Sequence, residues 1–243
     1  MAVHSSLKEL FTGIADAIRE KSGGTGEIVA DNFPEEIKKL ETHDGEDAIV
    51  TRTYGDFYVN DRVEKIGRYA FYAKDRLYSV SFANATVMEE HAFDSCSYLR
   101  SIDAPNLMGI ETYGLGRTLI DKCNFPKLGY VDNYAFSNST IRTLYMLGIL
   151  QSGVAGYVGH YSFSNSRMTH LVIKGRGLCK LHSTTAFDNT PIASGNGYIY
   201  VPRENVNYYK NADNWQTYAS QFRALEDYTV DGTITGELDE SKI

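Results

Sequence analysis

The chain has 243 residues, of which 42% are hydrophobic and 23% are charged, and its formal charge is −7 at pH 7. This composition indicates a folded chain that buries a core, and it excludes disorder. A membrane-spanning helix is excluded because no apolar stretch approaches ~20 residues. With 31 acidic against 24 basic residues and only three scattered cysteines, we expect no nucleic-acid partner, no membrane insertion and no disulfide framework.

Residues 1–41 predict a helical hairpin. Apolar residues recur at helical spacing over residues 5–22, three glycines follow, and a second short helix is expected from residue 31, where Pro34 suits the first turn. The N-terminus has no basic segment followed by an apolar core, so we expect no secretory signal in this chain. Residues 42–59 are interpreted as a linker and the start of the next domain.

An internal repeat begins near residue 60. A small residue followed by a large apolar one recurs at positions 70, 92, 114, 135, 162 and 186, so the steps are 22, 22, 21, 27 and 24 residues. Downstream positions keep the same phase, and they alternate apolar and polar as a short half-buried strand does. The best examples are Val80 with Phe82, Ile102 with Ala104, and Leu144 with Met146.

A repeat of ~20 to 29 residues with one short strand is typical of leucine-rich-repeat solenoids. We therefore predict a β-rich solenoid over residues 60–202, a right-handed coil of about six repeats. Bulges are expected in the third unit, at GRTLIDKCNFPKL, and in the fourth, at LGILQSGVAGYVGH. Residues 203–228 are expected to form a capping helix with Trp215, Tyr218, Ala219 and Phe222 on one face, and residues 229–243 a polar tail.

Two resemblances carry information on biological context. The phrase IGRYAFYAKDRLYSVSF, repeated as MEEHAFDSCSYLRSIDA and VDNYAFSNSTIRTLYM, resembles the BspA-like leucine-rich repeats of bacterial surface and secreted proteins. The segment LFTGIADAIREKSGGTGEIVADNFPEEIKKL is similar to an N-terminal module of bacteriophage tail and other prophage-encoded structural proteins. The second resemblance implies that residues 1–41 attach the chain to other virion proteins.

The sequence offers little catalytic chemistry. The histidines are dispersed without paired metal spacing, Cys179 with His182 is the closest Cys/His pair, and neither a phosphate loop nor a nucleophile elbow is present. Glu89 with Glu90, and Asp61 with Glu64, could be imagined as glycosidase pairs, but neighbouring acids are more often solvated. We expect no enzyme activity, no cofactor and no metal.

Two columns are candidate binding surfaces, because stacking turns residues in phase into continuous rows. The first is the outward face of the predicted strands: Ser79, Ser81, Ser101, Asp103, Thr143, Tyr145 and His170, with Val172. The alternative is an aromatic row immediately before the small residues: Tyr69, His91, Tyr113, Tyr134 and Tyr161. The competing interpretation of the first column is a merely solvated face. That of the aromatic row is a cover for the turn edge.

These observations favour a non-enzymatic recognition or structural protein, tail-associated in a phage or prophage, whose solenoid binds protein or glycan on a cell surface. The alternative is a bacterial BspA-like surface adhesin that binds host protein, and a glycan hydrolase ranks third. The chain is accordingly expected in a virion or at the cell surface.

The polar linker predicts that the repeats fold without the N-terminal hairpin. Deleting residues 1–45 should leave the main thermal transition of the remaining chain in place, as measured by circular dichroism. A fall of the transition temperature by more than about 10 °C would contradict the division, because a perturbation of ~1 kcal/mol shifts it less.

Overall fold

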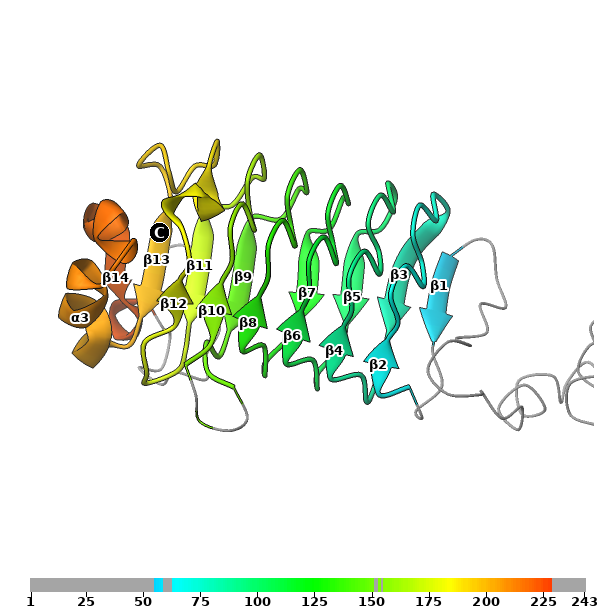
Figure 1. Ribbon diagram of the computed structural model, residues 1–243, viewed down its shortest axis with the longest axis horizontal. Helices are drawn as coiled ribbons and strands as arrows, with labels where there is room; N and C mark the ends of the chain where they lie inside the picture. The colour runs from blue at the N-terminus through cyan, green and yellow to red at the C-terminus, as the bar shows by residue number, and fades with distance from the viewer. Residues whose placement is uncertain (1–54, 59–62, 151–152, 154, 229–243) are drawn as a thin grey trace, which may run out of the picture. The chain divides into compact units, whose positions relative to one another are not determined.

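The computed structural model describes residues 55–58, 63–150, 153 and 155–228. The predicted hairpin in residues 1–41 and the tail at 229–243 lie outside the described residues. Within them the chain winds in successive coils, each with one longer and one two-residue strand (Figure 1). The predicted parallel-strand repeat region of about six units is therefore confirmed.

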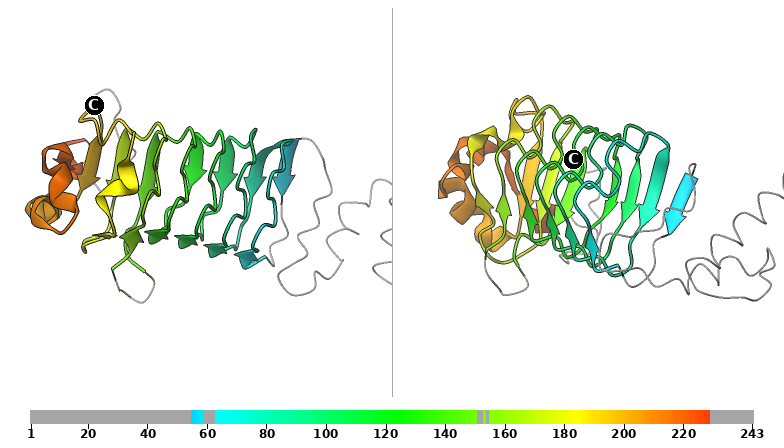
Figure 2. Two further views of the ribbon diagram at one scale, coloured as in Figure 1. Left: turned by 45° about the horizontal axis from the view of Figure 1, so that its top comes forward. Right: turned by 45° about the vertical axis from the view of Figure 1, so that its right-hand side comes forward.

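Two ranks of strands run along the stack of coils (Figure 2). The longer strands are β1 (Gly55–Tyr58), β3 (Leu77–Ser81), β5 (Ser101–Asp103) and β7 (Lys122–Asn124) in one sheet, then β9 (Thr143–Met146), β11 (His170–Ile173), β13 (Tyr198–Val201) and β14 (Phe222–Ala224) in another. The short strands form a third sheet: β2 (Lys65–Ile66), β4 (Val87–Met88), β6 (Gly109–Ile110), β8 (Tyr130–Val131), β10 (Tyr157–Val158) and β12 (Lys180–Leu181). Within each sheet the described strands pair in parallel with the equivalent strand of the adjacent coil, and no pairing joins β7 to β9.

The core lies between the two ranks and is built from columns of equivalent side chains. One column is the large residue of each repeat, and its phenylalanine rings stack on one another. Phe71 and Phe93 have ring centroids 4.7 Å apart at an interplanar angle of 2°. The column comprises Phe71, Phe93, Leu115, Phe136, Phe163 and Phe187, all at most 1% exposed.

The turn between the short and the longer strand joins neighbouring coils through the backbone. Alternate N–H groups donate to carbonyls of the next coil: Phe71 to Ala92 over 2.8 Å, and Phe93 to Gly114 over 2.9 Å. This pattern coincides with two left-handed residues per turn, four positions apart, such as Tyr69 and Ala73 at φ of 58° and 55°. The two left-handed residues of each turn orient alternate N–H groups toward the next coil.

The small residue of each repeat lies where this turn approaches the rest of its coil. An added Cβ on Gly114 would stand 2.6 Å from Cγ2 of Ile110, closer than two carbon atoms can pack. The equivalent Ala92, Ala135, Ser162 and Ala186 are fully buried, whereas Ala70 in the first coil is exposed. Space thus excludes a larger side chain at position 114, and the small residues of the other four coils after the first are enclosed by the fold.

The third repeat shows no bulge toward the second repeat, but its strand β7 is not paired with β9 of the fourth, so an irregularity appears there as a break between the two sheets of longer strands. Strand β7 keeps the register of β5, with Cys123 opposite Ile102. Ile120 and Phe125 are buried in phase with the neighbouring repeats. Two charged residues, Asp121 before the strand and Lys122 at its first position, make the repeat's apolar spacing hard to recognise in the sequence.

The fourth repeat carries the predicted insertion. An antiparallel bridge joins Ile149 and Ala155 in the segment between β9 and β10. The rank of longer strands divides one step earlier in the chain, between β7 and β9, because the described pairings join β7 to β5 and β9 to β11. The outward strand surface therefore consists of two halves.

The C-terminal cap differs from the single helix that the sequence predicts. It consists of a short helix α3 (Val206–Asn211), a 3₁₀ segment (Trp215–Gln221) and β14, so Phe222 pairs with Ile199 as a strand residue. Trp215 donates through Nε1 to the Cys179 carbonyl over 2.7 Å. The cap therefore continues the sheet of the longer strands and satisfies main-chain groups of the last coil.

The phenylalanine column predicts a large stability loss on truncation. Phe93→Ala should lower the free energy of unfolding by about 3 to 5 kcal/mol, because Phe93 is fully buried and the stacked column cannot collapse into the space. Denaturant unfolding measures this loss. Tyr98→Ala, at a side chain that is 59% exposed, is the control and should stay within about 0.5 kcal/mol. A loss below about 1 kcal/mol at Phe93 would contradict a close-packed column.

Candidate functional site

The outward surface of the longer strands, here called the strand face, carries two rows of side chains. Strand register aligns them, so each row crosses successive coils. The first row is Ser79, Ser101 and Lys122, then Thr143, His170 and Tyr198. The second row is Ser81, Asp103 and Asn124, then Tyr145, Val172 and Tyr200.

The N-terminal half of the strand face, from β3 to β7, is small and polar. Asn124 donates through Nδ2 to Oδ1 of Asp103 over 2.7 Å, and the Ser81 hydroxyl lies 3.5 Å from the other carboxylate oxygen. Asp103 is exposed, while Ser79, Ser81 and Ser101 are half-buried. This half offers hydroxyl and carboxylate groups at the spacing of the strands.

The C-terminal half, from β9 to β14, is bulkier and partly covered. Thr143 and His170 are half-buried neighbours, with Oγ1 of Thr143 3.5 Å from Nδ1 of His170. The expectation that Val172 faces solvent is wrong: Val172 is fully buried in a cluster with Tyr200 and Leu225. Chain that follows β14 folds back over this end of the face, and the repeat pattern gives no sign of it.

The predicted aromatic row forms a ladder of stacked rings. Centroid distances between successive rings, from Tyr69 through His91, Tyr113 and Tyr134 to Tyr161, are 4.8, 4.9, 4.7 and 5.0 Å, with interplanar angles from 5° to 13°. Every ladder residue has a positive φ, between 54° and 58°. In the sixth coil Thr185 takes the equivalent place and lies in a 3₁₀ turn (Thr184–Phe187).

Stacking decides what the ladder can offer to a ligand. A sugar or peptide that packs on an aromatic residue needs a ring face, and inside the ladder both faces of each ring are occupied by neighbours. The Tyr69 ring ends the described ladder, is 47% exposed and has the Arg68 guanidinium 5.5 Å from its centroid. The geometry favours a structural role for the row, and its role as a binding stripe stays a prediction.

A buried carboxylate below the ladder was not recognised in the sequence. Asp94 is fully buried, lies 2.8 Å from Nδ1 of His91 and forms an ion pair with Arg117. A buried aspartate is tolerated only with such partners. The sequence could have indicated this burial, because small residues hold the equivalent position in the next three repeats: Gly116, Ser137 and Ser164.

A second, shorter aromatic column was also missed. Tyr130 stacks on Tyr157 at 5.2 Å, and Tyr157 stacks on His182 at 4.5 Å. Partial burial raises the pKa of the Tyr130 hydroxyl, and nearby Glu111 raises it further. The tyrosine at position 130 occupies the space above Gly109, where an added Cβ would fall within the ring.

The carboxylates considered as a glycosidase pair have structural partners. Glu89 accepts the main-chain N–H of Arg68 over 3.2 Å, and Glu90 forms an ion pair with the Arg68 side chain. Partial burial raises the pKa of the neighbouring Glu111, and the negative charge of Glu89 raises it further. These acids fasten one coil to the next, and Asp61 lies outside the described residues.

The pair Cys179 and His182 is not brought together as a site. Cys179 is fully buried, and its N–H donates to the Tyr209 hydroxyl over 2.8 Å, whereas His182 is exposed on the tyrosine column. Over the described ranges, no group of three His, Cys, Asp or Glu residues is arranged to hold a metal ion. In the same part of the chain, no helix has the length and apolarity to cross a membrane.

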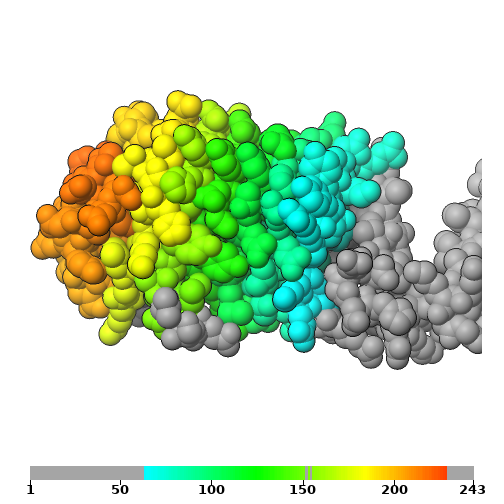
Figure 3. All heavy atoms as spheres, in the orientation of Figure 1, coloured from blue at the N-terminus to red at the C-terminus, as the bar shows by residue number. Residues whose placement is uncertain are grey.

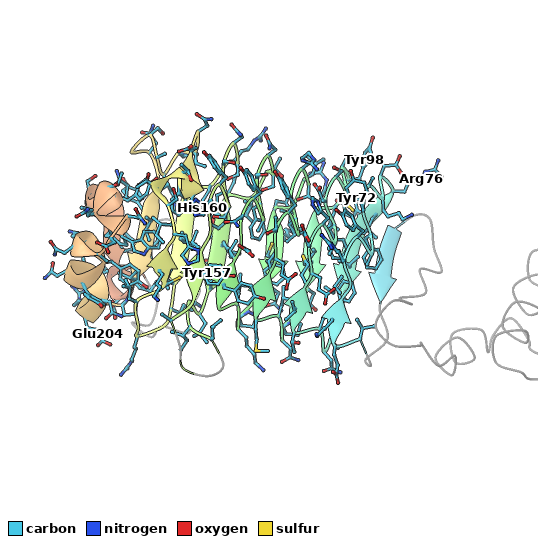
Figure 4. The ribbon with its side chains drawn as sticks, in the orientation of Figure 1. Tyr72, Arg76, Tyr98, Tyr157, His160 and Glu204 are labelled. Carbon is cyan, nitrogen blue, oxygen red and sulfur yellow. The ribbon has the colours of Figure 1, made fainter. Side chains whose placement is uncertain are left out.

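The figures place these features along the stack. In Figure 4, Tyr157 and His160 lie over the middle coils, Tyr72, Arg76 and Tyr98 over the first coils, and Glu204 beside the cap. Figure 3 shows the coils as adjoining bands of side chains from the first repeat to the cap.

Comparison with known proteins gives a family match and four matching chains of solved structures. The crystal structure of the pneumococcal vaccine antigen PcpA is similar, with a TM-score of 0.39 and 15% sequence identity. The alignment covers 70% of this chain and 39% of that chain, a likeness too distant to support an argument. No curated protein matches.

The family match lies on the repeats. A family model described as BspA type leucine rich repeat region matches residues 64–194 in six copies, and repeats of this family are typically non-enzymatic and bind protein. Residues 1–41 lie outside this match, so the attachment module stays a prediction. Because the match spans more than half of the sequence and coincides with the coils, the chain belongs to the BspA-type leucine-rich repeat family.

Proposed function

We propose that this chain is a non-enzymatic adhesin-type protein of a bacterial cell surface, and that its strand face binds an extended segment of a host protein. The observation that carries the proposal is the strand face itself, where strand register aligns side chains into rows over β3, β5 and β7 and again over β9, β11 and β13. Membership of the BspA-type family supports it.

The spacing of the rows suits an extended ligand. Neighbouring strands lie about 4.8 Å apart, so a ligand crossing them meets one side chain of each row per coil. Ser79, Ser101 and Thr143 are half-buried, so their hydroxyl groups are held by the packing around them. Such prearranged polar groups reduce the entropy lost on binding.

The virion reading rests on the resemblance of residues 1–41 to phage tail modules, and it is kept as the second candidate. In both readings the solenoid is the part that recognises a surface. A glycan hydrolase needs two carboxylates about 5 to 10 Å apart in a cleft, and the engagement of Glu89 and Glu90 with Arg68 leaves that reading without a catalytic pair there.

The strand face predicts a loss of binding when charge is introduced on it. The double variant Ser101→Glu with Thr143→Glu should lose at least about tenfold in affinity on an array of purified extracellular-matrix proteins, because both side chains lie in the first row. The control is Gln216→Glu with Thr217→Glu at exposed positions of the cap, which should bind as the unmodified chain does. Retained affinity in the folded strand-face variant would move the site elsewhere.

Location separates the two readings. We expect the chain on the outside of intact bacterial cells, where added protease degrades it while a cytoplasmic marker survives. Immunogold labelling of purified phage particles is the opposing measurement. Labelled particles together with unlabelled cells would replace the adhesin proposal with the virion reading.

A further inference from the structure

The N-terminal end of the stack presents main-chain carbonyls without a preceding turn. In the second coil, three turn carbonyls each accept an N–H of the first coil over 2.8 to 3.1 Å, and they belong to Glu90, Ala92 and Asp94. One repeat earlier, the equivalent carbonyls are those of Arg68, Ala70 and Tyr72. Among the described residues, no main-chain N–H donates to them. Such an open row of acceptors is a template for pairing with another stretch of main chain.

The side chains at this end show a closed interior and an open rim. Ala70 is exposed, whereas the equivalent small residues of later coils are fully buried. Tyr69 and Tyr72 are 47% and 44% exposed. Phe71 is the first ring of the buried column and stacks on Phe93 with one face, yet it is only 1% exposed. The rim formed by the turn is therefore the part of this end that lacks a cover.

Strand β1 lies in front of the first coil and continues the stack. It pairs in parallel with β3, and Phe57 lies opposite Val80, 23 residues further along the chain. This separation is one repeat, so β1 is the longer strand of a unit that precedes the first coil. In complete coils the small residue comes nine or ten positions before the middle of that strand, as Ala135 precedes Leu144 and Ala70 precedes Val80. The residues just before β1 can reach the open rim, because an extended chain spans about 3.5 Å per residue.

The sequence before β1 carries the repeat's signature in phase. Ala48 and Ile49 are a small residue followed by a large apolar one, and Ala48 stands nine positions before Phe57. It also stands 22 positions before Ala70, and the following step of the repeat is again 22 residues. Both residues lie outside the described ranges. The chain divides into two compact units between Asp47 and Ala48, so this pair belongs to the unit that contains the coils.

We propose that residues 48–52 form the turn of a seventh, incomplete coil, which covers the open rim of the first coil. In the phase of the repeat, the N–H of Ile49 donates to the carbonyl of Ala70, and the N–H of Thr51 donates to that of Tyr72. Continuity with β1 selects this occupant, because a segment of the same chain loses less entropy on docking than a second molecule does. A covered rim keeps this end of the stack from pairing with a second copy of the chain. The inference concerns the end of the stack and is independent of the strand face.

A disulfide in the full chain tests the docking. Side chains three positions after the small residue meet across neighbouring coils, since Arg117 donates to Ser95 over 2.9 Å and Asn189 donates to Asn165 over 2.9 Å. Thr51 and Ala73 hold this position in the seventh and the first coil. Thr51→Cys with Ala73→Cys should form an intramolecular disulfide under oxidised glutathione, because the ~4.8 Å spacing of coils lies within the Cα range of about 4.4 to 6.8 Å that a disulfide spans.

The matched control is Thr51→Cys with Ser95→Cys, the same position two coils apart. The separation of about 10 Å exceeds what a disulfide spans, so this pair should stay reduced. Peptide mass spectrometry identifies the linked residues, and thermal unfolding of each variant verifies folding. A disulfide in both pairs, or in neither, would overturn the proposal. A disulfide between two chains would also overturn it and would assign the rim to a second copy.

A stability measurement tests the same docking without cysteines. Ile49→Asp should lower the main thermal transition by at least about 5 °C, because it places a charge against the end of the phenylalanine column. Val50→Asp is the control, because position 50 is in phase with the exposed Tyr72, and it should shift the transition by less than about 2 °C. Equal shifts at the two positions would contradict a turn in the phase of the repeat.

Discussion

The structure depends on main-chain hydrogen bonds that run from the turn of one coil to the turn of the next. Three N–H groups per turn donate in this way in the first coil, from Tyr69, Phe71 and Ala73 over 2.8 to 3.1 Å. Parallel strands join the coils on two sides, and this turn joins them where the short strand gives way to the longer one. Because each coil contacts only its neighbours, the chain has the nearest-neighbour cooperativity of a solenoid.

That arrangement has a conformational cost, and the aromatic ladder offsets it. A left-handed conformation destabilises a residue other than glycine by roughly 1 to 2 kcal/mol, yet tyrosine or histidine stands at five such positions. Stacked aromatic pairs contribute about 0.5 to 1.5 kcal/mol beyond the burial of their surface, which is of the same order. In the sixth coil, Thr185 at the equivalent position has no ring, and the turn becomes a 3₁₀ helix. The turn itself thus gives the aromatic row a structural role, and its role as a binding stripe stays a prediction.

Much of the solenoid was predictable because the period of the sequence is the period of the structure. The small residue, the phenylalanine column and the strand alternation each repeat in phase, and stacking converts phase into position. The predictions that are wrong concern the place where the repeats meet the non-repeating C-terminal cap. Phe222 belongs to a strand because the cap extends the sheet, and Val172 is covered by the chain after β14. Cys123 was missed for a different reason. It takes the place of an aliphatic residue opposite Ile102, but cysteine does not match the aliphatic pattern by which the strand is recognised in the sequence. The candidate site was predictable as rows, but its division into a small, polar half and a bulkier, partly covered half was not, because residues that follow β14 cover the second half.

The position of the insertion between β9 and β10 has a consequence for how such a gene can change. Before it, the small residues recur every 21 or 22 positions, so duplication or loss of one unit between Ala70 and Ala135 would add or remove a coil with matching bonds at both joints. After it, the last coil is committed to the cap by the bonds of Trp215 and Tyr209 to its main chain. Related genes are therefore expected to vary in length through the N-terminal coils, which lengthens the polar surface and leaves the capped end unchanged.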